Sequence, residues 1–351
     1  MGTTEAAGAH AGPRLAEHTT LRLGGPARRL DVARTDDELV GLVRDADARG
    51  EPLLLLGGGS NLVVADEGFD GSVVRIATRG VRRRAGTVTA AAGEDWDAFV
   101  AGAVADGLAG VEALSGVPGL VGASPIQNVG AYGQDVAQTV SAVRVLDRAT
   151  GDVRTMTPQE CRFTYRHSVF KGNDRYVVLD VTFELEPAAT GSPVRYSELA
   201  HHLGVELGDQ APLPDVRQAV LDLRRRKGMV LDASDHDTWS VGSFFTNPLL
   251  STDEVDRLPA DAPRWPEADD RVKVSAAWLI ERSGFARGSA LLPDAAARIS
   301  TKHTLALTNR GTASTADLLA LAGAIRAAVH ARFGVVLAPE PVLVGCTLPP
   351  V

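Results

Sequence analysis

The first third of the chain alternates short apolar runs with segments of helical spacing. Apolar residues recur every three or four positions over residues 36–50, which end in glycine, so we predict a helix there. Residues 51–64, EPLLLLGGGSNLVV, predict a short buried strand, a glycine loop and a second strand, and VVRIA (73–77) predicts a third. The segment EDWDAFVAGAVADG (94–107) predicts a second helix.

The rest of the chain begins with a stretch in which apolar residues show neither helical spacing nor the alternation of a strand. Residues 116–136, GVPGLVGASPIQNVGAYGQDV, are rich in Gly and Pro without being low in complexity, which indicates a shaped loop. Further on, the pattern predicts a hairpin over 140–157, strands over 176–187, 303–309 and 335–345, and helices over 212–228, 273–284 and 314–334. This mixture of types predicts an α+β protein of about three domains.

Composition and charge narrow the class of protein. The 351 residues are 44% hydrophobic and 23% charged, which is ordinary for a globular chain of two or three domains. The net charge of −8 argues against a general nucleic-acid binder, because phosphate affinity needs clustered cations. No stretch approaches the ~20 apolar residues of a membrane span, and the N-terminus has neither the basic nor the apolar region of a secretion signal.

The two cysteines, the N-terminal residues and one basic run add further expectations. Cys161 and Cys346 offer neither a disulfide framework nor metal-ligand spacing, so we expect a reducing, cytoplasmic location and no metal site. Residues before about Pro13 are small and polar, and we expect them to be disordered. One basic run, residues 224–227, could serve a small anionic ligand.

Two glycine-rich loops are the first candidates for a binding site. In residues 56–62, LGGGSNL, three glycines allow positive φ, and consecutive amides with Ser60 and Asn61 could form a nest for a pyrophosphate. A strand follows instead of a helix, so this is neither a Walker loop nor a Rossmann fingerprint, and a plain tight hairpin is an equal alternative. The second loop, 116–136, could be a structural Ω-loop. Two such loops together favour a clamp on one extended ligand, such as a dinucleotide cofactor.

Five motifs give the chain a family resemblance. GGGSNLVV, GVPGLVGASPIQNVGAYG, TYRHSVFK, GSFFTNP and a terminal PEP strand occur in the order found in the UDP-N-acetylenolpyruvoylglucosamine reductase (MurB) family. The resemblance runs from about His18 to Gly345. The first motif is shared with the wider vanillyl-alcohol-oxidase-like flavoproteins, whereas GSFFTNP with YRHSVFK is far more specific. The insertion around Tyr196 resembles the type I subclass, whose extra loop covers the substrate.

The resemblance implies an α+β fold with a two-lobed FAD-binding module of the vanillyl-alcohol-oxidase type and a smaller C-terminal α+β substrate-binding domain. We expect the first FAD-binding subdomain at 14–83, the second at 84–211 and the substrate-binding domain at 212–334. A C-terminal strand within 335–346 is expected to return to the FAD lobes.

The implied reaction is the NADPH-dependent reduction of UDP-N-acetylglucosamine enolpyruvate to UDP-N-acetylmuramate, in peptidoglycan precursor synthesis. Non-covalent FAD carries the electrons, and NADPH and substrate use one site in turn. Hydride goes to the vinyl terminus and negative charge develops on C2 and the carboxylate. The site therefore needs a cation near the carboxylate and a proton donor over C2. The resemblance implies no nucleic-acid or membrane partner, and we expect a monomer.

Three residues match the family's catalytic positions. Ser243 matches the proton donor, Arg166 the arginine that stabilises the enolate, and Glu340 the glutamate near the intermediate. A guanidinium suits the second role because it stays charged and can hold a carboxylate bidentately. Outside the family context, the three would be a turn serine after glycine, a surface ion-pair arginine and an edge-strand carboxylate between prolines.

The resemblance also implies ligand contacts. For FAD these are Gly57, Gly58, Gly59, Ser60, Asn61, Leu62, Gly119, Gly122, Ala123, Ser124, Gln127 and Asn128. For substrate or NADPH they are Tyr132, Tyr196, Lys227, Asn247 and His303. Lys227 could pair with a diphosphate or simply end a solvated helix, where the helix dipole favours a cation. Tyr196 has little flanking identity, and His303 is a binding candidate whose alternative is a core-edge histidine.

Two rival functions stay open at this point. One is a flavin oxidase of the same superfamily, many of which tether flavin through His or Cys; neither glycine loop contains such a residue. The other is a non-catalytic nucleotide-sugar or flavin-binding protein. That hypothesis requires the loss of Arg166, Ser243 or Glu340, and all three are present.

Overall fold

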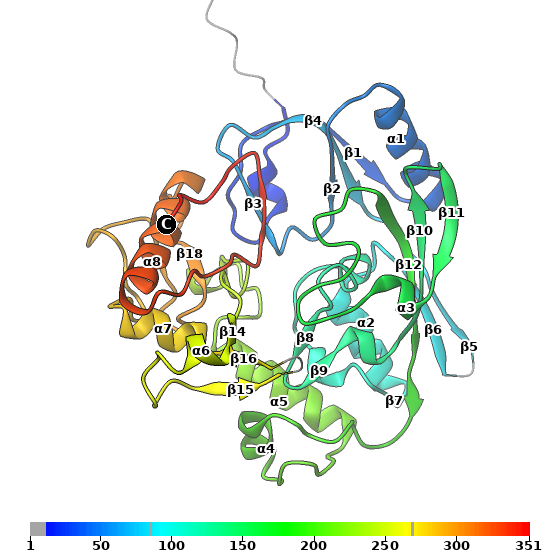
Figure 1. Cartoon of the computed structure of the whole chain (residues 1–351). Coiled ribbons are helices and arrows are strands. Elements are labelled where there is room, and N and C mark those ends of the chain that lie inside the picture. The colour runs from blue at the N-terminus through cyan, green and yellow to red at the C-terminus, as the bar shows by residue number, and fades with distance from the viewer. Residues whose placement is uncertain (1–11, 85, 268–269) are drawn as a thin grey trace, which may run out of the picture.

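The fold places an N-terminal lobe and a middle lobe on one side and a C-terminal domain on the other (Figure 1). The computed structural model describes residues 12–84, 86–267 and 270–351. The predicted disorder before Pro13 falls on residues 1–11, outside the described residues. The mixture of sheets and helices confirms the predicted α+β class.

The N-terminal lobe is built on a parallel sheet of order β1–β4–β2. Its strands are β1 (Ala27–Ala33), β4 (Phe69–Ile76) and β2 (Leu53–Leu56), with α1 (Asp36–Ala48) against them. The predicted helix at 36–50 is thus confirmed, and Thr35 caps it by accepting a hydrogen bond from Glu38 N. Leu39 and Val43 of α1 pack with Val74 beneath the helix.

The middle lobe is an antiparallel sheet of order β11–β10–β12–β6–β5. Its strands are β5 (Val81–Arg84), β6 (Thr87–Ala91), β10 (Val140–Asp147), β11 (Asp152–Met156) and β12 (Tyr176–Glu184), and β7 (Leu108–Ala109) pairs with β13 (Glu186–Pro187) beside it. The predicted hairpin at 140–157 is confirmed as β10 and β11. Helix α2 (Trp96–Ala105) buries Trp96 and Phe99 against Phe183 of β12.

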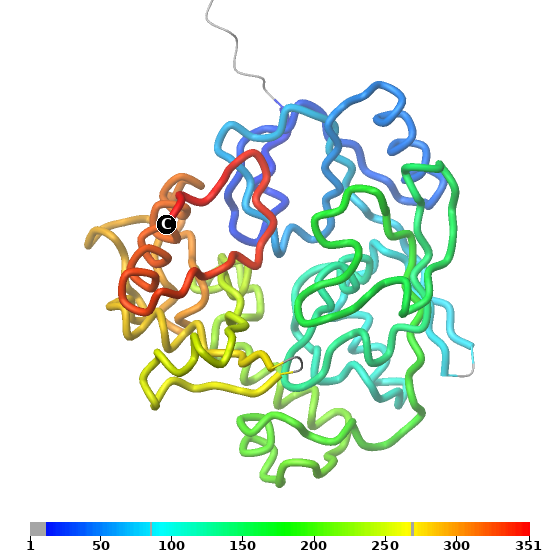
Figure 2. The backbone as a smooth tube through the Cα atoms, in the orientation of Figure 1, coloured from blue at the N-terminus to red at the C-terminus, as the bar shows by residue number. Residues whose placement is uncertain are grey.

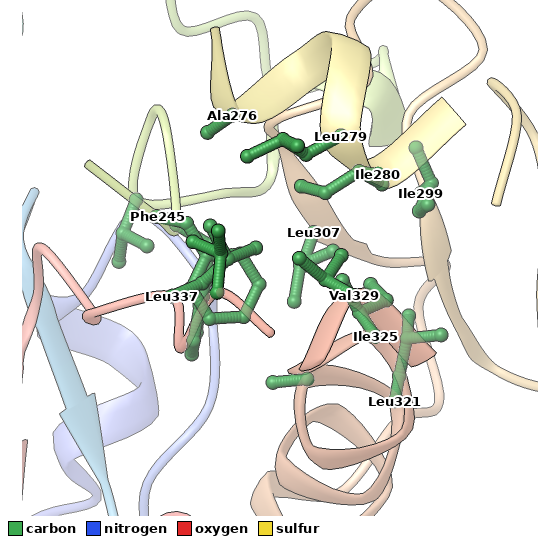
Figure 3. Packing of buried hydrophobic residues seen from close by; sticks show 14 of the residues in the cluster. Phe245, Ala276, Leu279, Ile280, Ile299, Leu307, Leu321, Ile325, Val329 and Leu337 are labelled. Carbon is green, nitrogen blue, oxygen red and sulfur yellow. The ribbon is translucent and has the colours of Figure 1, made fainter. Parts of the chain in front are cut away.

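The C-terminal domain packs three helices around small sheets. Its elements are β14 (Leu249–Ser251), α6 (Thr252–Val255), β15 (Arg264–Pro266), β16 (Arg271–Val274), α7 (Ala276–Arg282), β17 (Ala297–Ile299), β18 (Leu307–Asn309) and α8 (Thr315–Phe333). Leu321, Ile325 and Val329 of α8 gather with Ile280 and Leu307 in one apolar core (Figure 3). The predicted helices at 273–284 and 314–334 are confirmed, the first beginning three residues later than expected because Lys273 and Val274 end β16.

Two helices lie beside the middle lobe and close to the cavity described below. Helices α4 (Ser197–Leu203) and α5 (Leu213–Arg226) pack on each other through Leu199, Ala200, Val216 and Val220. The predicted helix at 212–228 is α5. The short helix α3 (Pro158–Cys161), the two-residue strands β8 (Gly130–Ala131) and β9 (Gln134–Asp135), and five 3₁₀ turns complete the described elements: Leu15–His18, Glu112–Leu114, Val121–Ala123, Val136–Gln138 and His236–Thr238.

The end of the chain crosses back to the N-terminal lobe, as the red segment in Figure 2 shows. There β19 (Val342–Val344) pairs in parallel with β3 (Leu62–Val64), directly after the first glycine loop. The strand predicted over 335–345 is therefore shorter than expected. Pro339 and Pro341 lack the N–H that a strand ladder requires, so regular pairing begins only at Val342. Over the described ranges, no helix has both the length and the apolar character needed to span a bilayer.

Candidate active site

A cavity of ≈ 310 Å³ lies where the two lobes meet the C-terminal part of the chain. Its lining includes residues of both glycine loops (57–62 and 117–130), the end of α5 with the following turn (224–231) and the segment 238–243, together with Arg166 and Glu340. Sequence segments that are far apart thus meet around one space. This is the geometry expected of a site for an extended ligand.

The two glycine loops press against each other at the cavity wall. A Cβ on Gly58 would lie 2.9 Å from the Cα of Gly119, and one on Gly59 would lie 2.0 Å from the carbonyl oxygen of His18. Gly59 also has a φ of 59°. Ser60 Oγ donates a hydrogen bond to Pro118 O (3.1 Å), which joins the loops directly. Only glycine permits this approach, so the glycines here have a specific structural reason.

Most residues predicted to contact FAD line this cavity, namely Gly57, Gly58, Gly59, Ser60, Asn61, Leu62, Gly119, Ala123, Ser124 and Gln127. Gly122 and Asn128 are not among the lining residues. A Cβ on Gly122 would lie 2.4 Å from Ala92 Cβ, so this glycine allows the loop to approach the strand end. Asn128 donates to Thr164 O and accepts from Ala137 N, and thereby holds the loop in shape. The FAD-contact assignments as a whole stay predictions.

Unpaired polar atoms in the wall show what kind of ligand the cavity fits. Among the described residues, no hydrogen-bond partner reaches the buried Gln127 Oε1 or the buried Arg224 Nε. A buried polar atom without a partner is costly, so a ligand that supplies one donor and one acceptor here is favoured. The flavin ring of FAD carries both along one edge. The residues therefore fit a bound FAD.

Ser243 reaches the cavity on a bend that the C-terminal segment holds in place. It follows Gly242, whose φ is 75°. The next residue, Phe244, is fully buried, and its carbonyl oxygen accepts a hydrogen bond from Glu340 N (2.9 Å). Thr246 N donates to Ala338 O in the same pairing. This backbone pairing brings the segments that carry Ser243 and Glu340 together.

Arg166 is fixed by acceptors from three directions. Its Nε lies 3.3 Å from Glu340 Oε1, its Nη2 donates to Gly130 O (2.6 Å) and its Nη1 donates to Asn128 O (3.4 Å). Its φ of 52° is in the left-handed region, which residues other than glycine rarely adopt and which indicates a tight bend here. Each η nitrogen carries two N–H donors and uses one of them in these hydrogen bonds, so within the described structure one donor on each is left for a ligand.

Glu340 is half-buried and lies near two cations, Arg166 and Lys171. Burial raises the pKa of its carboxyl group. The positive charges of Arg166 and Lys171 act in the opposite direction and offset part of that increase. Its backbone oxygen accepts hydrogen bonds from Gln127 Nε2 (3.2 Å) and Asn61 Nδ2 (3.4 Å). Glu340 is thus tied to both glycine loops, and its carboxyl holds a proton more readily than a surface glutamate does.

Three of the predicted substrate residues lie together at the end of α5. The rings of Tyr132 and Tyr196 meet edge to face with centroids 5.4 Å apart, and Lys227 Nζ lies 5.7 Å from the centroid of the Tyr132 ring. Lys227 also forms an ion pair with Glu198. Gly130 and Gly228, close neighbours of Tyr132 and Lys227 in the chain, line the cavity. Tyr132, Tyr196 and Lys227 are not themselves among the lining residues, so the cluster lies beside the cavity and not in its wall.

The other two predicted substrate residues have different surroundings. Asn247 Oδ1 accepts a hydrogen bond from Ala276 N (2.9 Å), so half of its amide is used at the start of α7. Burial, together with the nearby charges of Lys227 and Arg224, lowers the pKa of His303 to about 4. His303 is therefore a neutral neighbour of the Lys227 cluster, which suits ligand binding more than acid–base catalysis.

We expect an NMR pH titration of the FAD-loaded protein to give His303 a midpoint of about 4. The lowered pKa means that the neutral form persists throughout the neutral range, because burial and two cations disfavour the imidazolium. His303→Gln assigns the signal by its disappearance. A midpoint near the ordinary value of about 6.5 would contradict the buried, cation-flanked environment.

Arg224 is a site residue that the sequence analysis did not single out. It is half-buried, lines the cavity and donates from Nη2 to Met229 O, and the burial of its guanidinium lowers its pKa. The available signal was the basic run at 224–227, of which only Lys227 became a candidate. The two neighbouring arginines differ in their surroundings, because Arg224 is half-buried and lines the cavity whereas Arg225 is exposed.

Comparisons with known proteins agree with this geometry. The family model of the UDP-N-acetylenolpyruvoylglucosamine reductase C-terminal domain matches residues 234–344, and that of an FAD binding domain matches residues 27–157. The chain is 57% identical to the UDP-N-acetylenolpyruvoylglucosamine reductase of Thermobifida fusca (strain YX), over 95% of this chain and 97% of that protein. It is 55% identical to that of Saccharopolyspora erythraea, over 99% of each.

A solved structure shows the same likeness. The fold matches the crystal structure of UDP-N-acetylenolpyruvylglucosamine reductase (MurB) from Thermus caldophilus with a TM-score of 0.66 and 25% identity. The match covers 95% of this chain and 97% of that one.

Proposed function

The chain belongs to the UDP-N-acetylenolpyruvoylglucosamine reductase family, and from this premise we propose that it reduces UDP-N-acetylglucosamine enolpyruvate to UDP-N-acetylmuramate with NADPH. The reaction is a step of peptidoglycan precursor synthesis, and we place it in the cytoplasm. NADPH and substrate use one site in turn, and the enzyme works as a monomer. Membership in a family of FAD-dependent reductases removes the two rivals, a flavin oxidase and a non-catalytic binding protein.

One observation carries the proposal. Ser243, Arg166 and Glu340 come from three segments that are far apart in the sequence, and all three line the cavity that both glycine loops border. The ion pair between Arg166 and Glu340 and the backbone pairing of Glu340 with Phe244 join the three segments. A proton donor and a fixed cation therefore face the same space, which is what protonation of a carbon beside a carboxylate requires.

The proposed roles come from the family resemblance, and the contacts of Arg166 and Glu340 support them. Arg166 binds the substrate carboxylate through its two remaining donors, and its three protein contacts hold the guanidinium in place beforehand. Ser243 donates a proton to C2. Glu340, whose pKa burial raises, returns a proton to Ser243 directly or through water. FAD, held by the two glycine loops, supplies the hydride chemistry when bound.

The test is an anaerobic stopped-flow experiment with two half-reactions. We expect the purified protein to be yellow, to release FAD on denaturation, and to lose its visible flavin absorbance on mixing with NADPH. Adding UDP-N-acetylglucosamine enolpyruvate to the reduced enzyme should restore the colour. Bleaching by NADPH without recovery by this substrate would overturn the proposed substrate, and folded protein that takes up no FAD would overturn the proposed chemistry.

A further inference from the structure

The ammonium group predicted to bind a diphosphate already has an anionic partner. Lys227 Nζ forms an ion pair with Glu198 Oε2, and the two side chains are 31% and 40% exposed. Glu198 is the second residue of α4, and Lys227 caps the C-terminal end of α5. The pair therefore joins two helices at the border of the cavity, and its partial exposure leaves it accessible to a competing anion.

The same cation links this carboxylate to the aromatic pair. Tyr196, two residues before Glu198, meets the ring of Tyr132, over which Lys227 lies. Tyr132 has a φ of 49°, so its ring is carried by a tight bend next to the cavity-lining Gly130. The buried contact between α4 and α5, through Leu199 and Val220, does not depend on the ion pair. Glu198 can thus release Lys227 without unpacking the helices.

The geometry points to Glu198 as an internal competitor for the diphosphate: its carboxylate occupies Lys227 in the ligand-free enzyme and is displaced when a nucleotide diphosphate binds. This inference rests on the proposed function, because it takes Lys227 as the diphosphate ligand. Glu198 is therefore a residue that sets nucleotide affinity, and it acts through Lys227.

A weakened hold on diphosphates suits an enzyme whose site must empty between ligands. In the proposed cycle NADP⁺ leaves before the substrate enters, and both carry a diphosphate. Return of Lys227 to Glu198 helps each ligand to depart. Partly exposed ion pairs contribute little, so we expect Glu198→Gln to lower the dissociation constant for uridine diphosphate by about two- to fivefold, and the difference to shrink at high salt.

Calorimetric titration of the FAD-loaded protein with uridine diphosphate tests this inference. Glu198→Gln should bind more tightly than the wild type, whereas Glu198→Asp, which keeps a carboxylate, should stay within about twofold of it. In a Lys227→Gln background the same Glu198→Gln change should have no effect, because the group for which the anions compete is absent. Glu206→Gln, an exposed glutamate after α4, is the matched control and should leave affinity unchanged.

The outcomes separate this inference from the proposed function. Weaker binding by Glu198→Gln would show that the carboxylate orients Lys227 for the ligand. Unchanged binding would show that the carboxylate neither competes for Lys227 nor orients it. Either result overturns the inference. An equal gain in the Lys227→Gln background would overturn it as well, since the effect would then bypass Lys227. The proposed function stands or falls separately, on whether the enolpyruvyl substrate restores the flavin colour in the wild-type enzyme.

Discussion

Ser243→Ala is expected to slow reoxidation of the reduced enzyme by its substrate by about 10²–10⁴-fold, the usual contribution of a general acid. Bleaching by NADPH should be unchanged, because that half-reaction requires no protonation of carbon. The substitution removes one hydroxyl group and little volume, so folding and FAD binding should survive. Rapid mixing of the reduced variant with UDP-N-acetylglucosamine enolpyruvate measures the effect, and in D₂O the wild type should incorporate deuterium at C2.

Ser240→Ala is the matched control for this experiment. Ser240 lines the same cavity three residues earlier, and its hydroxyl accepts a hydrogen bond from Gly242 N (3.2 Å) within the turn. We expect this variant to reoxidise within about threefold of the wild type, since a lost turn hydrogen bond costs only ~1 kcal/mol of stability. If Ser243→Ala reoxidises within tenfold of the wild type, Ser243 is not the proton donor.

Hydrophobic periodicity predicted the long helices well and the short strands less well. Helices α1, α5 and α8 were found within a few residues of their bounds, since each carries an apolar stripe that it buries locally. Strand β1, ARRLDVA, gave no clear signal, because its pairing with β4 supplies a stability that its own sequence does not show. The same holds for the short strands β14, β15 and β16 of the C-terminal domain, which the pattern did not predict.

The site residues also fall into two groups, those that sequence motifs predicted and those that only the tertiary structure showed. Ser243, Arg166 and Glu340 were predicted because short motifs carry them, although no periodicity relates residues so far apart in the sequence. Arg224 and the pairing of Glu198 with Lys227 depend on how α5 packs against α4 and the middle lobe. No local pattern reports that packing. Motifs therefore supplied the candidate catalytic residues, and the tertiary structure showed which charged side chains lie near them.

Arg166→Gln is expected to slow the substrate half-reaction by about 10²–10³-fold, the usual effect of removing one donor that stabilises a developing oxyanion. NADPH-driven bleaching should change little, because the guanidinium acts on the substrate carboxylate as it becomes enolate-like. The variant also leaves Gly130 O without its donor and Glu340 without its cation, so some loss of stability is expected. Rates from single-turnover mixing and melting temperatures should therefore be recorded together.

Two further variants separate charge, geometry and folding. Arg166→Lys keeps the positive charge but loses the planar fork, so its reoxidation rate should lie between those of the wild type and Arg166→Gln. Arg162→Gln makes the same substitution at an exposed arginine of the same segment, and Arg162 has the same left-handed backbone (φ of 50° against 52°). It should leave both half-reactions intact. Equal damage to bleaching and reoxidation by Arg166→Gln would mean that Arg166 supports the loop around Gly130 and does not act on the substrate.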